Sequence, residues 1–210
     1  MTTKISLREK KKARTKLTLL QAGLELIGEG TFRNVLVEDI CQRAEVSKVT
    51  FFKFFPQKED MLVYFMSIWQ AERFVELEDS PIRGWAAVRH IYSKVAEQSQ
   101  EQPGIMLSLI SFLAEQRMHP WIPELSPAEL HLLFPDKEDI EEIMKNSLPG
   151  LFRRAMKEAK EDGQLAECLS EDEAVVLLFT TFYGSYLSAH LCQSTDYMAF
   201  YDMHIKPLQR

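Results

Sequence analysis

Positive and hydroxyl-bearing side chains recur at short intervals between Ser47 and Lys58. A lysine ammonium binds phosphate oxygens as a point charge, and it can also reach the guanine acceptors in the major groove of DNA. A valine or threonine methyl group can contact a thymine methyl. The side chains that could take these roles are Lys48, Val49, Thr50 and Lys53. This chemistry requires a rigid helix that presents them together on one face.

Two short helices joined by a tight turn are predicted to hold these side chains. Apolar residues at i, i+3, i+4 and i+7 predict a first helix over residues 37–44, and Ser47 is placed to cap a second over residues 48–54. Pro56 ends the second helix because it lacks an N–H and restricts the residue before it. This is the helix-turn-helix pattern. Its seven-residue second helix, roughly 10 Å long, fits a major groove about 12 Å wide.

Charge is divided unevenly along the 210-residue chain. Residues 1–60 carry 12 Lys and Arg against 8 Asp and Glu, whereas residues 61–210 carry 13 against 23. The arm formed by residues 1–16 holds seven of the basic residues and Glu9 alone among acids. We expect nucleic acid to meet only the N-terminal end, where the arm can neutralise phosphates. The alternative for the arm is a solvated tail. The first helix is predicted over residues 14–29, ended by Gly28 and Gly30.

From Gly30 to Leu62 the sequence resembles the TetR family of bacterial transcription regulators. The resemblance is carried by GTF at 30–32, VEDICQRAEVS at 37–47 and TFFKFFPQKEDML at 50–62. It covers about the first third of the chain, and beyond it rests on length and helical layout. It implies an all-α fold of about nine helices. Residues 1–57 would form a three-helix helix-turn-helix DNA-binding domain with a basic N-terminal arm, and residues 58–210 a helical ligand-binding and dimerisation domain.

Several residues depart from the family pattern. Leu36 replaces a capping threonine, Glu45 replaces the turn glycine, and Phe52 and Phe54 replace a tyrosine and a histidine that donate to the DNA backbone. Lys48 and Lys53 can substitute by charge, and Lys58 matches a lysine that reaches a phosphate. The alternative is that these phenylalanines only pack the domain. The predicted DNA-binding residues are Arg14, Lys48, Val49, Thr50, Phe52, Lys53, Phe54 and Lys58.

Seven further helical segments are predicted after the motif. Their ranges are 58–76, 85–100, 105–118, 128–134, 136–162 with a break near 146–149, 171–192 and 196–206. The helix over 105–118 is apolar on nearly every side, which indicates a central, buried element. Ser170 and Glu173 form a capping box, and Gly163 ends the preceding helix.

The resemblance implies an effector pocket in the body of the protein. Aromatic and methionine side chains suit an apolar or aromatic small molecule, although each is more often plain core. The predicted effector-binding residues are Met66, Trp69, Tyr92, Met106, Ile110, Phe152, Phe179 and Tyr183.

A stripe of small residues on the helix over 171–192 resembles the dimer interface of the family. Small side chains at three- and four-residue spacing let another helix approach closely, either from a second subunit or from the same chain. The stripe consists of Thr181, Gly184, Ser185, Ser188 and Ala189.

Catalysis finds no support in the sequence. A glycine-rich phosphate loop, G-x-S-x-G, H-E-x-x-H and C-x-x-C are all absent. The three cysteines have no zinc or disulfide spacing, so no metal and no cofactor is expected. No run of 18 apolar residues and no signal peptide is present, so we expect no membrane span and a cytoplasmic location.

The sequence therefore predicts a homodimeric regulator, most simply a repressor, with double-stranded DNA and a small-molecule effector as partners. Two alternatives belong to other classes: a protein of the same fold whose main partner is another protein, and an enzyme. Lack of any tight DNA site would favour the first, and turnover of a bound small molecule the second.

Overall fold

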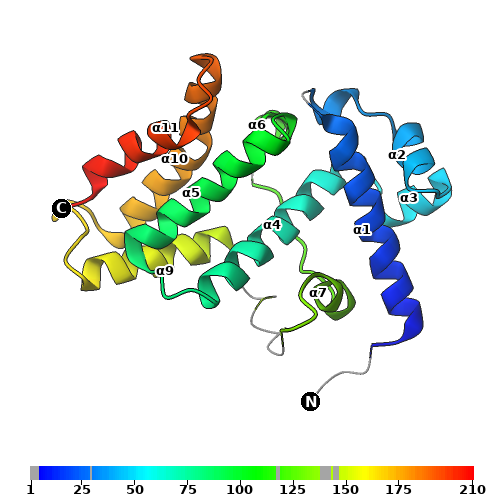
Figure 1. Cartoon of the computed structure of the whole chain (residues 1–210), viewed down its shortest axis with the longest axis horizontal. Helices are drawn as coiled ribbons and strands as arrows, with labels where there is room; N and C mark the ends of the chain where they lie inside the picture. The colour runs from blue at the N-terminus through cyan, green and yellow to red at the C-terminus, as the bar shows by residue number, and fades with distance from the viewer. Residues whose placement is uncertain (1–4, 29, 117–118, 138–142, 144–146) are drawn as a thin grey trace. The chain divides into compact units, whose positions relative to one another are not determined.

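The structure is a computed structural model that describes residues 5–28, 30–116, 119–137, 143 and 147–210. Within these ranges it consists of ten α-helices and two short 3-10 helices, with one isolated antiparallel bridge between Leu165 and Gln209 in place of a sheet (Figure 1). The predicted all-α class is confirmed. The helices are α1 Leu7–Ile27, α2 Val37–Arg43, α3 Lys48–Phe54, α4 Asp60–Glu78, α5 Gly84–Glu101, α6 Gly104–Glu115, α7 Pro127–Leu133, α9 Leu148–Glu161, α10 Glu171–Leu191 and α11 Tyr197–Ile205; the 3-10 helices are η1 Phe32–Asn34 and η2 Lys206–Leu208.

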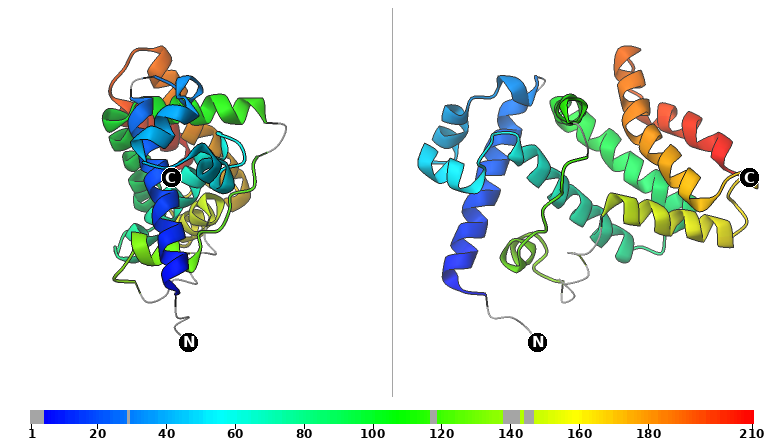
Figure 2. Two further views of the ribbon diagram at one scale, coloured as in Figure 1. Left: turned by 90° about the vertical axis from the view of Figure 1, so that its right-hand side faces the viewer. Right: turned by 180° about the vertical axis from the view of Figure 1, so that it is seen from behind.

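The chain forms two compact units, and α4 contributes to both. The first unit comprises Met1–Ala71 and Gln102–Lys145, and the second comprises Glu72–Glu101 and Asn146–Arg210. In the first, α1 packs against α2, α6 and α7; in the second, α5, α9, α10 and α11 pack side by side (Figure 2). These units are not the predicted DNA-binding and ligand-binding domains, and the functional boundary after residue 57 stays a prediction.

Helix α1 starts earlier than the sequence predicted. It begins at Leu7 because Ser6 and Glu9 form a capping box, in which Ser6 N donates to the Glu9 carboxylate at 2.8 Å and Glu9 N donates to Ser6 Oγ at 3.2 Å. The predicted start at Arg14 is therefore wrong, and the second half of the basic arm is helical. The predicted stop is confirmed, since Gly28 is the C-cap with φ +52°.

The two helices of the motif form where the sequence places them. Helix α3 spans Lys48–Phe54, and Ser47 Oγ accepts from Thr50 N as its cap. Helix α2 spans Val37–Arg43, but Leu36 at its N-cap position offers no side-chain acceptor. The core between them is apolar: Ile40 and Phe51 are fully buried.

The turn between α2 and α3 contains a non-glycine residue in the left-handed region. Glu45 has φ +55°, a conformation that costs an L residue about 1–2 kcal/mol. We therefore expect Glu45→Gly to raise the free energy of unfolding by about 0.5–1 kcal/mol, since part of the relief is offset by the greater freedom of glycine in the unfolded chain. Urea unfolding measures this change. Glu45→Ala, which keeps the strained backbone, is the control, and an equal gain with alanine would contradict the explanation.

Helix α6 differs in two ways from its prediction. It ends at Glu115, and Met118 lies outside the described residues. It is also not buried on all sides, because only its first part packs closely; Ile110, Phe112 and Leu113 remain half-buried. Its start fits tightly against the loop after α1: a Cβ on Gly104 would lie 2.0 Å from the Gly30 carbonyl oxygen, so only glycine fits there.

The break predicted near residues 146–149 is confirmed by the cap of α9. Ser147 has an extended backbone and its Oγ accepts from Gly150 N, so a helix starts afresh at Leu148. Gly163, at φ +65°, follows its end. Most of residues 138–146, the first part of the predicted long helix, lie outside the described residues. The Ser170–Glu173 capping box is present as predicted.

Candidate nucleic-acid interface and effector region

Helix α3 has one buried face and one exposed face. Phe51 is fully buried and its ring centroid lies 5.7 Å from that of Phe55. On the opposite face Val49 is 81% exposed and Phe52 48% exposed, and Lys53 is also exposed. These three predicted contact residues therefore lie on the exposed surface of α3, and their contact with DNA stays a prediction.

Two other predicted contact residues of α3 are less available. Thr50 is half-buried, and its Oγ1 lies 3.0 Å from Ser47 Oγ at the helix cap. Phe54 is half-buried at the last turn. The structure thus gives Thr50 a capping environment and leaves Val49 as the better-placed methyl group for a base edge.

Lys48 is exposed but already has an anionic partner. Its ammonium forms an ion pair with the Glu38 carboxylate of α2, and a hydrogen bond from Lys48 lowers the pKa of that carboxyl. Both side chains are more than half exposed, so the pair is weak and its lysine can exchange a carboxylate for a phosphate. DNA binding through Lys48 must compete with Glu38.

Lys58 is engaged inside its own unit. Its Nζ donates to the carbonyl oxygens of Phe32, Arg33 and Val35, each at 3.0 Å. An ammonium has three donors, so all three are used to hold η1 and the chain that leads into α2. The phosphate contact implied for Lys58 would have to displace one of these carbonyls. In the structure the Lys58 side chain holds the segment that leads into α2, and its contact with DNA stays a prediction.

The basic residues of α1 extend the positive surface. Arg14 is exposed, as are Arg8, Lys11 and Lys12, and all of them are carried by one rigid helix. A helical arm loses less conformational entropy on binding a polyanion than a flexible tail does. Arg14 is thus accessible to a phosphate, and its role as a DNA contact stays a prediction.

A buried polar cluster joins α1 to α4 and α7. Glu129 is 4% exposed; its carboxylate pairs with Lys16 Nζ at 2.9 Å and accepts from Tyr64 Oη at 2.6 Å and Ser126 N at 2.7 Å. Lys16 Nζ also lies 3.7 Å from the centroid of the Tyr64 ring. Every buried polar atom of this cluster has a partner, so it fixes the position of α1. The sequence analysis did not single out these residues. The capping pattern of Ser126 and Glu129 was the available signal.

We expect Glu129→Ala to lower the free energy of unfolding by about 2–4 kcal/mol, because Lys16, Tyr64 and Ser126 would each lose an ionic or hydrogen-bonded partner. Urea unfolding followed by circular dichroism measures the loss. Glu124→Ala, at an exposed carboxylate of the preceding loop, is the matched control and should change the free energy of unfolding by less than about 0.5 kcal/mol. Equal effects of the two substitutions would contradict the role of the cluster.

The same carboxylate makes the stability depend on pH. Burial alone would raise the pKa of Glu129, but hydrogen bonds from Ser126 and Tyr64 and the charge of Lys16 lower it overall. A pKa lowered by folding gives stability that is complete above the unfolded value, near 4.5, and is lost as pH falls through the folded value. We therefore expect the difference between wild type and Glu129→Gln to shrink below about pH 4.5, and a difference that is constant between pH 7 and pH 3 would contradict it.

The eight predicted effector residues divide equally between the two units. In the first unit, Met66, Trp69 and Met106 are buried and Ile110 is half-buried. The other four, Tyr92, Phe152, Phe179 and Tyr183, belong to the second unit.

The four in the second unit form part of an aromatic core. The Tyr92 ring stacks on Tyr201 with centroids 4.4 Å apart, and its hydroxyl donates to the Leu178 carbonyl. Phe152 contacts Tyr92 at 6.0 Å and Phe179 at 5.4 Å between centroids. Tyr92 and Phe152 are fully buried, which is the packing alternative considered above, whereas Phe179 and Tyr183 are half-buried. Burial raises the pKa of Tyr183 to about 12.

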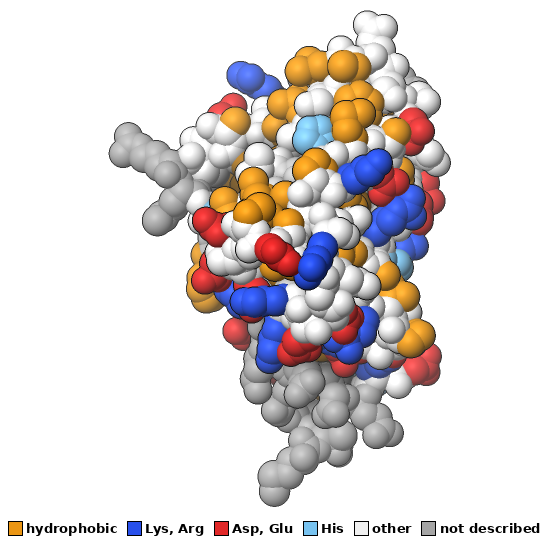
Figure 3. All heavy atoms as spheres, turned by 90° about the vertical axis from the view of Figure 1, so that its left-hand side faces the viewer, with side chains coloured by type: hydrophobic (Ala, Val, Ile, Leu, Met, Phe, Trp, Pro, Cys, Tyr) orange, Lys and Arg blue, Asp and Glu red, His pale blue; other side chains and the backbone are white. Residues whose placement is uncertain are grey.

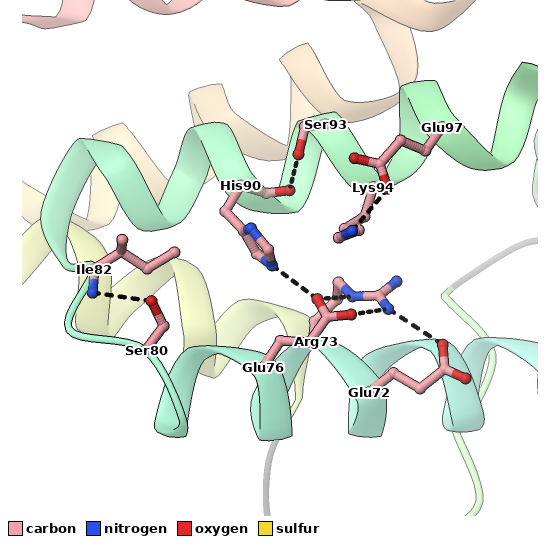
Figure 4. A network of polar contacts seen from close by, with 9 residues as sticks. All are labelled: Glu72, Arg73, Glu76, Ser80, Ile82, His90, Ser93, Lys94 and Glu97. Carbon is pink, nitrogen blue, oxygen red and sulfur yellow. Dashed lines mark hydrogen bonds and ion pairs between the residues drawn. The ribbon is translucent and has the colours of Figure 1, made fainter.

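A polar network ties the last turns of α4 to α5 (Figure 4). Arg73, only 6% exposed, donates through Nε and Nη2 to the two oxygens of Glu76 at 2.9 Å each, and Nη2 lies 3.3 Å from Glu72. His90 Nε2 of α5 lies 2.7 Å from Glu76. Burial opposes ionisation of Glu76, but Arg73 and His90 outweigh it and lower its pKa; burial raises the pKa of Glu72. Sequence reasoning missed Arg73, whose only signal is a charged residue within an apolar helix face.

The predicted dimer stripe on α10 is divided by the structure. Thr181, Ser185 and Ala189 are buried, and Ser185 Oγ lies 3.1 Å from His204 Nδ1 of α11. These three are therefore buried within the chain, and Ser185 is in contact with α11. Gly184 is half-exposed and Ser188 exposed.

Another side of the same helices is apolar and exposed. Hydrophobic side chains gather in the upper part of the face shown in Figure 3. The large exposed hydrophobic residues of α10 and α11 are Val176, Leu177, Leu187, Leu191 and Met203. The spacing of the small residues on α10 gave no indication of these side chains, whose exposure only the fold shows.

The described residues contain no cluster that could bind a metal ion and no disulfide. No group of three potential metal ligands comes together there, and Cys41, Cys168 and Cys192 are free thiols. Helix α10 has the length and composition of a membrane span, but 44% of its most apolar window is buried within the fold, and a core helix meets the same criterion.

The chain was compared with protein families, curated proteins and solved structures. Residues 19–65 match the family model described as bacterial regulatory proteins, tetR family. No curated protein matches the chain. Among solved structures, reduced E. coli NemR covers 93% of this chain and 98% of its own at 17% identity, with a TM-score of 0.61. FadR from Bacillus subtilis in complex with stearoyl-CoA covers 91% and 96% at 19% identity, with a TM-score of 0.62. FadR from Thermus thermophilus with lauroyl-CoA covers 92% of both chains at 20% identity, with a TM-score of 0.58.

Proposed function

We propose that this chain, which belongs to the TetR family of bacterial regulatory proteins, is a ligand-responsive repressor that binds an inverted-repeat operator as a homodimer. The observation that carries the proposal is the exposed face of α3. It presents Val49, Phe52 and Lys53 to solvent, while Phe51 anchors the helix in the core of the first unit. A recognition helix of this kind reads base edges and phosphates in a major groove.

The dimer is proposed to form through the exposed apolar side of α10 and α11. Val176 and Leu191 are 64% and 72% exposed, and Met203 is 63% exposed. Large exposed apolar patches commonly mark contacts with another protein surface. The exposed Ser188 and half-exposed Gly184 permit close helix approach. The helix-turn-helix domains of the two subunits, related by a twofold axis, would read half-sites separated by one helical turn of DNA, about 34–36 Å.

The effector is proposed to be a small apolar or aromatic molecule. Support comes from the predicted effector-binding side chains and from the two FadR structures, which are complexes with stearoyl-CoA and lauroyl-CoA. Helix α4 contributes to both compact units and is the proposed lever. An effector would release DNA only through different affinities for the DNA-bound and free conformations.

One observation favours a second candidate, a TetR-fold protein whose main partner is another protein. Leu36, Val49 and Phe52 are 58%, 81% and 48% exposed on the helix-turn-helix segment, and none of them donates a hydrogen bond. Such residues suit an apolar protein surface as well as thymine methyl groups.

Selection of bound sequences from random duplexes tests the proposal. A dimeric repressor should enrich an inverted repeat whose half-site centres lie about 10–10.5 base pairs apart, or a multiple of that spacing. Enrichment of a single half-site would contradict the dimer, and no enrichment above a control pool would favour the protein partner.

A further inference from the structure

A groove in the first unit lies beside the end of the recognition helix. Its volume is about 380 Å³, within the range of roughly 300–1,000 Å³ for small-molecule sites. Its walls come from the chain after α3, the start of α4, the end of α6 and the loop that carries Trp121. None of the eight predicted effector residues lines it, so it is a different place from the effector region.

Aromatic side chains contribute to the wall of this groove, although one of them, Tyr64, is only 1% exposed. Phe54, Tyr64, Phe112 and Trp121 all line it. Trp121 is 82% exposed, whereas Trp69 and Trp85 are 7% and 8% exposed. An indole this exposed has ring area that a ligand can cover.

The charge of the groove is negative once internal pairs are counted. Glu59 and Asp60 contribute two carboxylates, and Lys16 is the cation in the lining. The Lys16 ammonium is matched by Glu129 at 2.9 Å. The Asp60 carboxylate accepts from Gln57 N at 2.7 Å, a neutral donor that leaves its charge in place. The excess charge therefore favours a positively charged occupant.

One cation already uses an aromatic wall of the groove. Lys16 Nζ lies 3.7 Å from the centroid of the Tyr64 ring, within the distance at which a cation is attracted to a ring face. Cationic ammonium groups bound by aromatic side chains and carboxylates are a general recognition mode. The lining of this groove repeats that chemistry with Trp121 and Glu59.

We propose that this groove is a binding site for an aromatic organic cation. The positive group lies between the Trp121 face and the Glu59 carboxylate, and the ring packs against Phe112 and Phe54. Phe54 is the last residue of α3, so an occupant contacts the segment that ends the recognition helix. The site does not rest on the proposed DNA-binding function, because occupancy is measured without DNA.

The test compares three phenyl compounds on the full-length protein by calorimetry and by tryptophan fluorescence excited at 295 nm. They are benzyltrimethylammonium, neutral benzyl alcohol and anionic benzenesulfonate. The cation should bind about tenfold or more tightly than the alcohol, the anion should bind least, and the cation should change the emission of the exposed Trp121.

Variants locate the site. Trp121→Ala and Glu59→Gln should each weaken binding of the cation about five- to tenfold, whereas Trp121→Phe should keep most of it because it retains an aromatic face. Glu124→Gln, an exposed carboxylate of the same loop outside the lining, is the matched control and should leave the affinity unchanged. Equal affinity for the alcohol, or unchanged affinity of Trp121→Ala and Glu59→Gln, would overturn the proposal. Operator binding measured without any probe reports separately on the proposed function.

Discussion

Replacing both Lys48 and Lys53 with alanine should weaken binding to every duplex and flatten the salt dependence of that binding. Each lysine that neutralises one phosphate contributes about 0.9 to the slope of log K against log salt concentration. With both lysines lost from each subunit of a dimer, the slope should become shallower by about 3–4. Fluorescence anisotropy at several salt concentrations measures it, and an unchanged slope would refute the phosphate role.

The ion pair between Lys48 and Glu38 supplies the matched control for that experiment. Glu38→Gln leaves the lysine in place and removes its competing anion. We expect this variant to bind DNA more tightly than wild type by a few-fold at low salt, because the Lys48 ammonium no longer has to leave a carboxylate before it binds a phosphate. Weaker binding by Glu38→Gln would indicate that the carboxylate itself contacts a base, for example a cytosine amino group.

Placing charge on the exposed apolar side of α10 should convert the dimer to monomers. Leu187 and Leu191 are 37% and 72% exposed, so Leu187→Glu with Leu191→Glu should fold normally. Two buried, unpaired carboxylates in each subunit of an interface would cost several kcal/mol, so the mass measured by light scattering should halve. Affinity for an inverted repeat should fall at least about 100-fold, because each head then binds alone.

Leu7→Glu is the matched control for the dimer prediction. Leu7 is an exposed leucine, 70% accessible, at the start of α1 in the first unit. Its replacement adds the same charge without touching α10 or α11, so the mass should stay that of the dimer. A double variant on α10 that remains dimeric would place the subunit contact elsewhere.

Local signals in the sequence account for what could be predicted of the helix-turn-helix motif. The apolar spacing of α2, the Ser47 cap and the stop at Pro56 all act within a few residues, so the sequence predicts α3 to its ends. The start of α1 also depends on a local signal, but that signal was missed. A run of lysines suggested a tail, but the Ser6–Glu9 capping box starts a helix there.

Most of the features that could not be predicted depend on contacts between residues far apart in the sequence. Lys58 holds the Phe32, Arg33 and Val35 carbonyls, 23 to 26 residues away, and no local pattern indicates such partners. The small stripe on α10 shows the same limit. Its spacing predicts close helix approach, but only the fold identifies α11 as the helix that covers Ser185.

We expect the exposed face of α3 to read a specific DNA sequence. The most direct test is anisotropy of the purified protein with the DNA just upstream of its own gene, at two salt concentrations, against a scrambled duplex of the same composition. We expect a preference of about 10³-fold or more, together with an affinity that falls steeply with salt. Equal and weak binding to both duplexes, with no enriched site from the random selection, would contradict it.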